Sequence, residues 1–173
     1  MMMSAKMLIS NQAMTGASPA GILAAVNQTL CASSRKTRMF VTVWLGILDL
    51  SSGVMTCASA GHEYPFICTA EGGFRLYKDP HGLVAGGMMM TRYQDYQLAM
   101  HPGDQIFVYT DGVPDAVNEH GERFGMKRLE ETLKRLEGNG CQAVMEGVRD
   151  AVSRFAGDAE PYDDLTMMCL TYR

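Results

Sequence analysis

The feature that most constrains the fold is the run MFVTVWLGILDL at residues 39–50, in which β-branched and aromatic residues are concentrated. This composition predicts a strand that is buried on both faces. Ser51-Ser52-Gly53 follows directly and predicts a chain reversal. The next segment, VMTCASAG at 54–61, should therefore pair with the run as an antiparallel hairpin.

Helices are predicted before and after a series of strands. The first helix is apolar at Met3, Met7, Leu8 and Met14 and has no N-cap residue before its first turn. A polar loop is expected at Arg35–Arg38. The other predicted elements are a helix from Pro19, capped by Ser18, to about Ala32, strands at 64–69, 74–78, 92–100 and 105–110, helices at 126–137 and about 142–155, and a strand at 165–172. This order predicts an α+β fold with stacked antiparallel sheets rather than an alternating parallel sheet.

Length, charge and cysteine usage restrict the class of protein. A chain of 173 residues, 47% hydrophobic, suits one compact domain. The net charge is -4, and no Asp or Glu precedes Asp49, so residues 49–173 hold all 19 acids against 11 of the 15 bases. Such an acidic body argues against a nucleic-acid partner. Five scattered cysteines without a CxxC pair predict reduced thiols in the cytoplasm, and no segment reaches membrane-spanning length.

Two acidic segments are the candidates for chemistry. The apolar strand IFVYT runs directly into Asp111-Gly112, where the glycine allows backbone or ligand to approach closely. Asp163 and Asp164 stand just ahead of the final strand. Hard divalent cations prefer oxygen ligands, and Mg²⁺ is commonly held by one or two carboxylates together with water. If the two strand ends meet, Asp111 and Asp163 would form part of a metal site.

The same residues also have a purely structural interpretation. Asp-Gly after a strand is a common turn dipeptide, and Asp-Asp before a strand can be a solvated turn. The residues alone leave the two interpretations open.

Four motifs in register resemble a known family. They resemble bacterial protein phosphatases of the stage-two-sporulation-E type, a branch of the metal-dependent protein phosphatase 2C superfamily, over nearly the whole chain. The motifs are Ala-Gly-His at 60–62, Pro-Gly-Asp at 102–104, Tyr-Thr-Asp-Gly at 109–112 and Asp-Asp-Leu-Thr at 163–166.

The resemblance implies a fold, a reaction and a set of site residues. The fold would be an α/β/β/α sandwich of antiparallel sheets with two Mg²⁺ or Mn²⁺ ions at one end. A metal-activated water would attack a phosphoserine or phosphothreonine, so no side chain acts as the nucleophile. Asp111 and Asp163 match the family's two C-terminal metal ligands, and Gly112 and Asp164 would support them. The implied substrate is a phosphorylated signalling protein such as an anti-sigma-factor antagonist.

The resemblance breaks down at the start of the chain. The family carries two further strands, with a Gly-Gly-Asp segment and a Gly-Asp-Val-Ser-Gly-type segment whose Asp bridges both metals, and neither is present. We therefore expect residues 1–173 to be a single phosphatase-like domain truncated at its N-terminus and lacking its first strands.

Two consequences follow from the missing strands, and two alternative functions stay open. The chain should hold at most one metal, weakly, with little or no turnover alone, because like-charged ions repel unless anions intervene. A bared sheet edge should favour self-association. The alternative functions are a catalytically dead phosphoprotein-binding module and an oligomerisation module.

Overall fold

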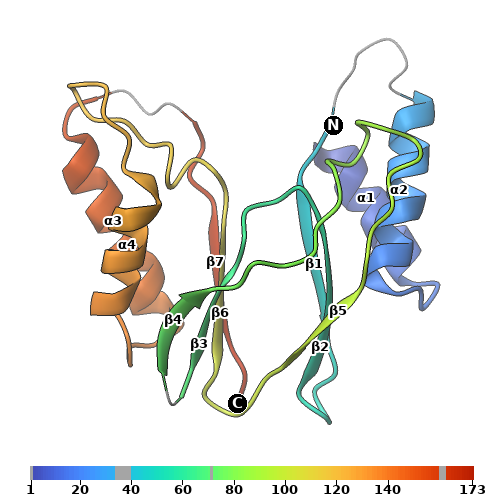
Figure 1. Ribbon diagram of the computed structural model, residues 1–173, viewed down its shortest axis with the longest axis horizontal. Coiled ribbons are helices and arrows are strands. Elements are labelled where there is room, and N and C mark those ends of the chain that lie inside the picture. Colours follow the sequence, from blue (N-terminus) through green and yellow to red (C-terminus); the bar gives the residue numbers. More distant parts are fainter. Residues whose placement is uncertain (1, 34–39, 71, 160–162) are drawn as a thin grey trace. The chain divides into compact units, whose positions relative to one another are not determined.

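The computed structural model describes residues 2–33, 40–70, 72–159 and 163–173 and shows two compact units (Figure 1). The first unit consists of Met1–His62 and Asp79–Met100, and the second of Glu63–Lys78 and His101–Arg173. Each unit contains one antiparallel sheet and one pair of helices. The predicted loop at Arg35–Arg38 lies outside the described residues, as do Glu71 and Tyr162.

The first unit is a three-stranded sheet with two helices on one face. The strand order is β1 (Val43–Leu48), β2 (Val54–Ala60) and β5 (Tyr96–Ala99), and all pairs are antiparallel. Helix α2 (Pro19–Ser33) packs on β2, and α1 (Met2–Ala13) packs on α2 (Figure 1). The predicted start of α2 is confirmed, and it buries the four predicted residues, Ile22, Leu23, Val26 and Leu30.

The β1–β2 hairpin is confirmed, but the burial predicted for its first strand is wrong. β1 lies at the edge of the sheet, and Ile47 is 44% exposed. Phe40, which precedes β1, is 61% exposed. An edge strand has a neighbour on one side only, so a composition typical of full burial does not guarantee it. On α1, Leu8 packs against the core of the unit, whereas Met3 and Met7 are exposed.

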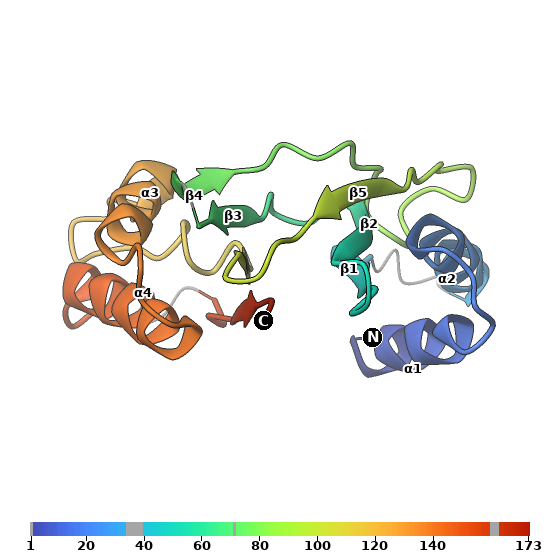
Figure 2. The same cartoon turned by 90° about the horizontal axis from the view of Figure 1, so that it is seen from below.

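The second unit is a four-stranded antiparallel sheet covered on one face by two helices. The order is β4 (Gly72–Leu76), β3 (Phe66–Thr69), β6 (Gln105–Tyr109) and β7 (Met167–Thr171). Figure 2 shows α3 (Gly125–Arg135) and α4 (Cys141–Ala156) on the same face of this sheet. The predicted β3–β4 hairpin and the final strand are confirmed.

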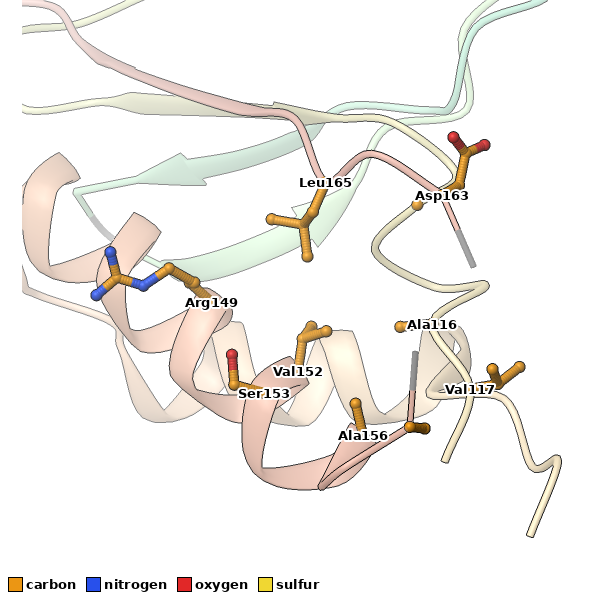
Figure 3. A pocket seen from close by; sticks show the side chains of 10 residues that line it. Ala116, Val117, Arg149, Val152, Ser153, Ala156, Asp163 and Leu165 are labelled. Atoms are coloured by element: carbon orange, nitrogen blue, oxygen red, sulfur yellow. The ribbon is translucent and has the colours of Figure 1, made fainter. Parts of the chain in front are cut away.

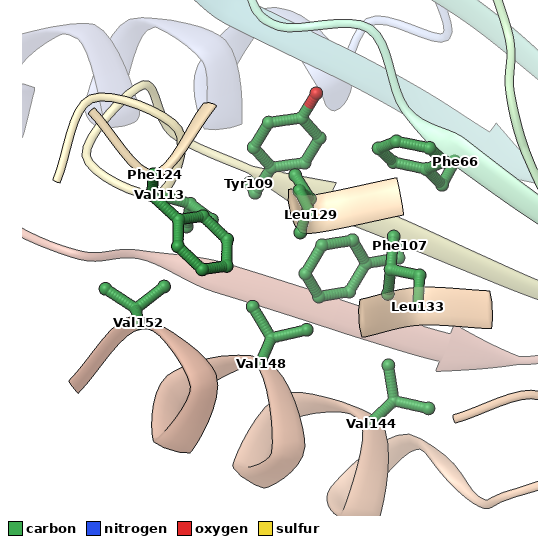
Figure 4. Packing of buried hydrophobic residues seen from close by; sticks show 10 residues of the cluster. All are labelled: Phe66, Phe107, Tyr109, Val113, Phe124, Leu129, Leu133, Val144, Val148 and Val152. Atoms are coloured by element: carbon green, nitrogen blue, oxygen red, sulfur yellow. The ribbon is translucent and has the colours of Figure 1, made fainter. Parts of the chain in front are cut away.

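The core of the second unit is aromatic along β6. Phe107 and Tyr109 are fully buried, with ring centroids 5.7 Å apart, and Phe66 lies 5.8 Å from Tyr109 (Figure 4). The helices fill the space above these rings at i,i+4 spacing, with Leu129 and Leu133 from α3 and Val144, Val148 and Val152 from α4. Each such buried side chain contributes about 1.5–3 kcal/mol. β6 is therefore held firmly up to Tyr109.

Asp104 anchors the start of β6. Its carboxylate is buried and accepts hydrogen bonds from the backbone N–H of Ala70 at 3.1 Å and of His101 at 2.8 Å. Gly103 adopts φ 100°, a left-handed conformation that favours glycine. The Pro-Gly-Asp motif thus ties the turn before β6 to the β3–β4 hairpin.

Among the described residues, every helix is too short or too polar to cross a bilayer.

Candidate functional site

The ends of β6 and β7 meet through Thr110. The ladder pairs Tyr109 with Met167, and the next hydrogen bond runs from the Thr110 N–H to the Thr166 carbonyl at 3.0 Å. The Thr110 hydroxyl accepts a bond from the Thr166 N–H at 3.2 Å. It also lies 3.4 Å from the carbonyl oxygens of Asp164 and Thr166. The residue before Asp111 is therefore fastened to the segment that follows Asp163.

Gly112 is in close contact with the same segment. A Cβ placed on Gly112 would collide with the Asp164 carbonyl group and lie 3.5 Å from Cα of Leu165. Gly112 does not have a positive φ, so its identity is not required by turn conformation. The close approach of another backbone is what excludes a side chain here. This observation favours the interpretation in which the two acidic segments are built to meet.

The two candidate ligands project from these segments into solvent. Asp111, Asp163 and Asp164 are all exposed, whereas Gly112 is buried. One oxygen of Asp163 accepts a bond from the Asp164 N–H at 2.7 Å. Figure 3 shows the Asp163 carboxylate at the rim of a pocket, pointing away from Val152 and Ala156 of α4. A carboxylate has about four lone-pair sites, so both acids retain acceptors for a cation.

The donor set fits part of a metal site. Two exposed carboxylates are the oxygen ligands that Mg²⁺ and Mn²⁺ prefer, and Mg²⁺ usually keeps several waters. Within the ranges that the structure describes, no three His, Cys, Asp or Glu side chains converge closely enough to hold a metal ion. Asp111 and Asp163 therefore offer oxygen ligands of the kind that one hydrated divalent cation takes, and in the described part of the chain no third such side chain joins them.

The pocket beside Asp163 is mostly apolar. Its volume is about 350 Å³, and α4 forms one wall with Val152, Ser153 and Ala156 (Figure 3). Arg149 and Asp163 lie toward opposite ends of this pocket. Gly112 and Leu165 also line it, so the pocket is continuous with the contact between the two acidic segments.

Two ionisable residues close to Asp111 in the sequence, Tyr109 and Asp115, have their contacts outside the candidate site. Burial raises the pKa of Tyr109 above its usual range, with smaller contributions from Glu63 and Glu130, so its hydroxyl stays neutral. That hydroxyl lies 3.5 Å from Sδ of Met126. Asp115 is paired with Arg123 at 2.9 Å. Asp115 is thus engaged in a surface ion pair rather than in the candidate site.

Sequence reasoning did not assign a role to Thr110. In the structure its hydroxyl and its backbone join the Asp111 and Asp163 segments. The signal available in the sequence was the threonine in both motifs, Tyr-Thr-Asp-Gly and Asp-Asp-Leu-Thr, which become opposite residues when β6 and β7 pair.

Comparison with known proteins identifies the family. The model of the family described as stage II sporulation protein E (SpoIIE) matches residues 1–173. The chain belongs to this family. It is 31% identical to protein IcfG of Synechocystis over 132 residues, which cover 76% of this chain and 20% of IcfG. It is 25% identical to the phosphoserine phosphatase RsbU of Bacillus subtilis over 158 residues, which cover 90% of this chain and 46% of RsbU. The chain thus spans about a fifth of one of these SpoIIE-type relatives and about half of the other.

Solved structures confirm the fold class. The SiaA-PP2C domain of Pseudomonas aeruginosa matches with a TM-score of 0.85 at 20% identity, over 99% of this chain and 68% of that chain. RsbX in complex with magnesium matches with a TM-score of 0.66 at 17% identity, over 96% of this chain and 69% of that chain. The predicted α+β fold of the protein phosphatase 2C type, with antiparallel sheets, is therefore confirmed for this SpoIIE-family chain.

Proposed function

We propose that this chain is the metal-dependent phosphoserine/phosphothreonine phosphatase domain of a bacterial signalling protein. The observation that carries the proposal is the contact of Gly112 with Asp164, which brings the two acidic family motifs together. The family match over residues 1–173 and the naming of RsbU as a phosphoserine phosphatase support it. Because the match spans both units, we propose that they form one phosphatase-like domain.

Asp111 and Asp163 would hold the cation, which is Mg²⁺ or Mn²⁺. When bound, such a cation lowers the pKa of a coordinated water and offsets the charge of the phosphoryl oxygens. The hydroxyl bonds of Thr110 and the close backbone contact between Gly112 and Asp164 would keep the two ligand-bearing segments in register. Without a cation, the exposed carboxylates would repel a phosphate group.

The chain alone should bind one cation weakly and turn over little substrate. Its first 48 residues contain no Asp or Glu, so they provide no carboxylate to bridge a second ion. Two exposed ligands leave most of the coordination shell to water, and such sites bind divalent cations loosely.

The substrate would be a phosphorylated protein, such as an anti-sigma-factor antagonist in the cytoplasm. Asp111 and Asp163 are both exposed, so a phosphoserine on the surface of a folded protein can reach them. The similarity to RsbU supports a substrate of this class.

We also propose that the chain self-associates through its first unit. β1 is an edge strand with Ile47 exposed, and Phe40 lies exposed just before it. On α1 and just beyond it, Met3, Met7 and Met14 are each more than 60% exposed. Exposed strand edges and apolar surface favour pairing with another chain. A monomeric mass in light scattering across micromolar concentrations would count against this proposal.

Phosphate release from a phosphoserine peptide tests the proposed activity. Release should require Mn²⁺ or Mg²⁺ and should be lost in Asp111→Asn. The matched control is Glu131→Gln, which removes the same charge from an exposed position on α3. Metal-dependent release that persists in Asp111→Asn would contradict the assignment of this residue.

The same assay separates the alternative functions. A catalytically dead binding module would retain the phosphopeptide without releasing phosphate. An oligomerisation module would neither bind the peptide nor respond to Asp111→Asn or Asp163→Asn.

A further inference from the structure

Two cysteines of the second unit lie where the start of α4 contacts β7, the last strand. Cys141 is the first residue of α4, and its Sγ lies 3.0 Å from the Thr171 hydroxyl of β7. Cys169 lies two residues before Thr171 on the same strand. Side chains at i and i+2 of a strand share one face, so Cys169 and Thr171 point to the same side of the sheet. Cys169 therefore lies on the face of β7 that Cys141 contacts through Thr171.

The surrounding fold holds this contact in place. Cys169 is paired with Phe107, whose side chain lies in the core covered by α3 and α4. Directly opposite residues of antiparallel strands project to the same face, so Cys169 points toward the helices. The residues before α4 are fastened to the sheet by Gln105, whose side chain donates to the Asn139 carbonyl at 2.8 Å. Cys141 and Cys169 therefore both border Thr171 on the helix-covered side of the sheet.

The two cysteines differ in environment. Both are partly exposed, so a small oxidant can reach the pair. Burial raises the pKa of the Cys169 thiol above its usual range, and the neighbouring Cys141 and Cys68 add to this effect. The raised pKa leaves little of Cys169 as the thiolate, which is the nucleophile, so Cys169 is the slower of the two thiols toward peroxide. We therefore assign the first attack on peroxide to Cys141, the first residue of α4.

We propose that Cys141 and Cys169 form a peroxide-sensitive thiol pair that closes into a disulfide between α4 and β7. This modification site is independent of the metal site. It involves none of the residues that join the Asp111 and Asp163 segments.

The chemistry is a two-electron oxidation with hydrogen peroxide as the oxidant. The Cys141 sulfur attacks one peroxide oxygen, the O–O bond breaks, and the departing hydroxide takes the thiol proton to form water. The Cys169 sulfur then attacks the sulfenic sulfur of Cys141, and the S–O bond breaks. The second hydroxide leaves with the Cys169 proton as water. Two thiols and one peroxide thus give one disulfide and two waters.

Intact mass and peptide mapping of the reduced chain after peroxide treatment test the proposal. The wild-type protein should lose about 2 Da, the mass of two hydrogens, and yield a peptide pair linked through Cys141 and Cys169. Cys141→Ser and Cys169→Ser should each abolish this link. In Cys169→Ser, Cys141 should accumulate as a sulfenic acid that a dimedone probe captures.

Two controls make the test specific. Cys68→Ser removes the third cysteine of the second unit, and Cys31→Ser removes one on α2 of the first unit. Both should leave the Cys141–Cys169 link unchanged. A peroxide-treated chain that stays unlinked, or that links Cys169 to Cys68 instead, would overturn the proposal.

Discussion

The two units have the same arrangement of a sheet and two helices, and they differ in the side chains that fill their cores. Each has an antiparallel sheet with two helices on one face, but the first unit packs α2 against small residues of β2, Ala58 and Ala60. The second packs α3 and α4 against aromatic rings on β6, including Phe107 and Tyr109. Aromatic side chains bury more area and add ring contacts. The second unit thus buries the larger side chains in its core, and it carries both candidate metal ligands.

The buried acids of the two units also differ. In the second unit, Asp104 accepts mainly from backbone N–H groups. In the first unit, the Asp79 carboxylate accepts a bond from the Tyr96 hydroxyl at 2.8 Å and lies 2.9 Å from Nδ1 of His81. Tyr96 in turn accepts a bond from Nε1 of Trp44 at 2.8 Å. The buried Asp79 of the first unit is therefore held by a chain of side-chain hydrogen bonds, whereas the buried Asp104 of the second unit is held mainly by the backbone.

The largest expected effect is on the aromatic core. Phe107→Ala should lower the free energy of unfolding by about 3–5 kcal/mol, because the cavity left by the ring cannot collapse against the neighbouring strands. Val26→Ala in the first unit should cost about 2 kcal/mol. Urea unfolding of both variants measures the difference. Equal losses of unfolding free energy in the two variants would contradict the difference between the two cores.

The next effect concerns the contact at the candidate site. Gly112→Ala should cost about 1–3 kcal/mol and weaken Mn²⁺ binding, because the methyl group would collide with the Asp164 carbonyl. The control is Gly21→Ala in α2, where a Cβ meets its nearest neighbours at 3.6 Å, an ordinary contact. This change should stabilise the chain by about 0.5–1 kcal/mol. Urea unfolding measures the stability of both variants, and a titration measures their Mn²⁺ binding. If Gly112→Ala changed neither quantity, the contact between Gly112 and Asp164 would have no part in the site.

A pair of tyrosines tests the polar network of the first unit. Tyr96→Phe should cost about 1–3 kcal/mol, because it leaves Asp79 and the Trp44 indole with an unmet hydrogen bond. The buried Tyr93 hydroxyl has no partner among the described residues. Tyr93→Phe should therefore leave stability unchanged or raise it by up to about 1 kcal/mol. Thermal unfolding that ranks the two variants in the opposite order would contradict this assignment.

The smallest expected effect is a loss of stability in alkali. Burial raises the pKa of Tyr93 from 10.0 to about 12, with a smaller contribution from Cys31. Between these two values the unfolded chain has lost the proton and the folded chain keeps it, so stability must fall as pH rises through this window. Urea unfolding near pH 9 and near pH 11 should show the fall, and Tyr93→Phe should reduce it. Identical pH profiles for the two proteins would contradict the buried position of this hydroxyl.

Local signals predicted most of the elements and singled out the two acidic segments. Ser18 and Pro19 marked the start of α2, and Ser51-Ser52-Gly53 marked the first hairpin. Asp111 directly follows one predicted strand, and Asp163 directly precedes another. Their segments lie together because these two strands, β6 and β7, are neighbours in the sheet.

Features that depend on strand order could not be predicted. Whether β1 is central or at an edge depends on which strands pair with it, and no local pattern in 39–50 records that. The same holds for Thr110, whose role exists only because β7 lies beside β6. The burial of Asp79 depends on its hydrogen bond from Tyr96. Tyr96 lies on β5, a strand distant in sequence that pairs with β2 of the first hairpin.

Binding of Mn²⁺, followed by the EPR signal of the free ion, tests the central claim most directly. We expect the wild-type chain to bind one ion weakly, with this binding lost in Asp111→Asn and in Asp163→Asn and retained in Glu131→Gln. If both acids hold the same ion, the double variant should bind no less than either single variant. Wild-type affinity in both single variants would contradict the claim that these two carboxylates share a cation.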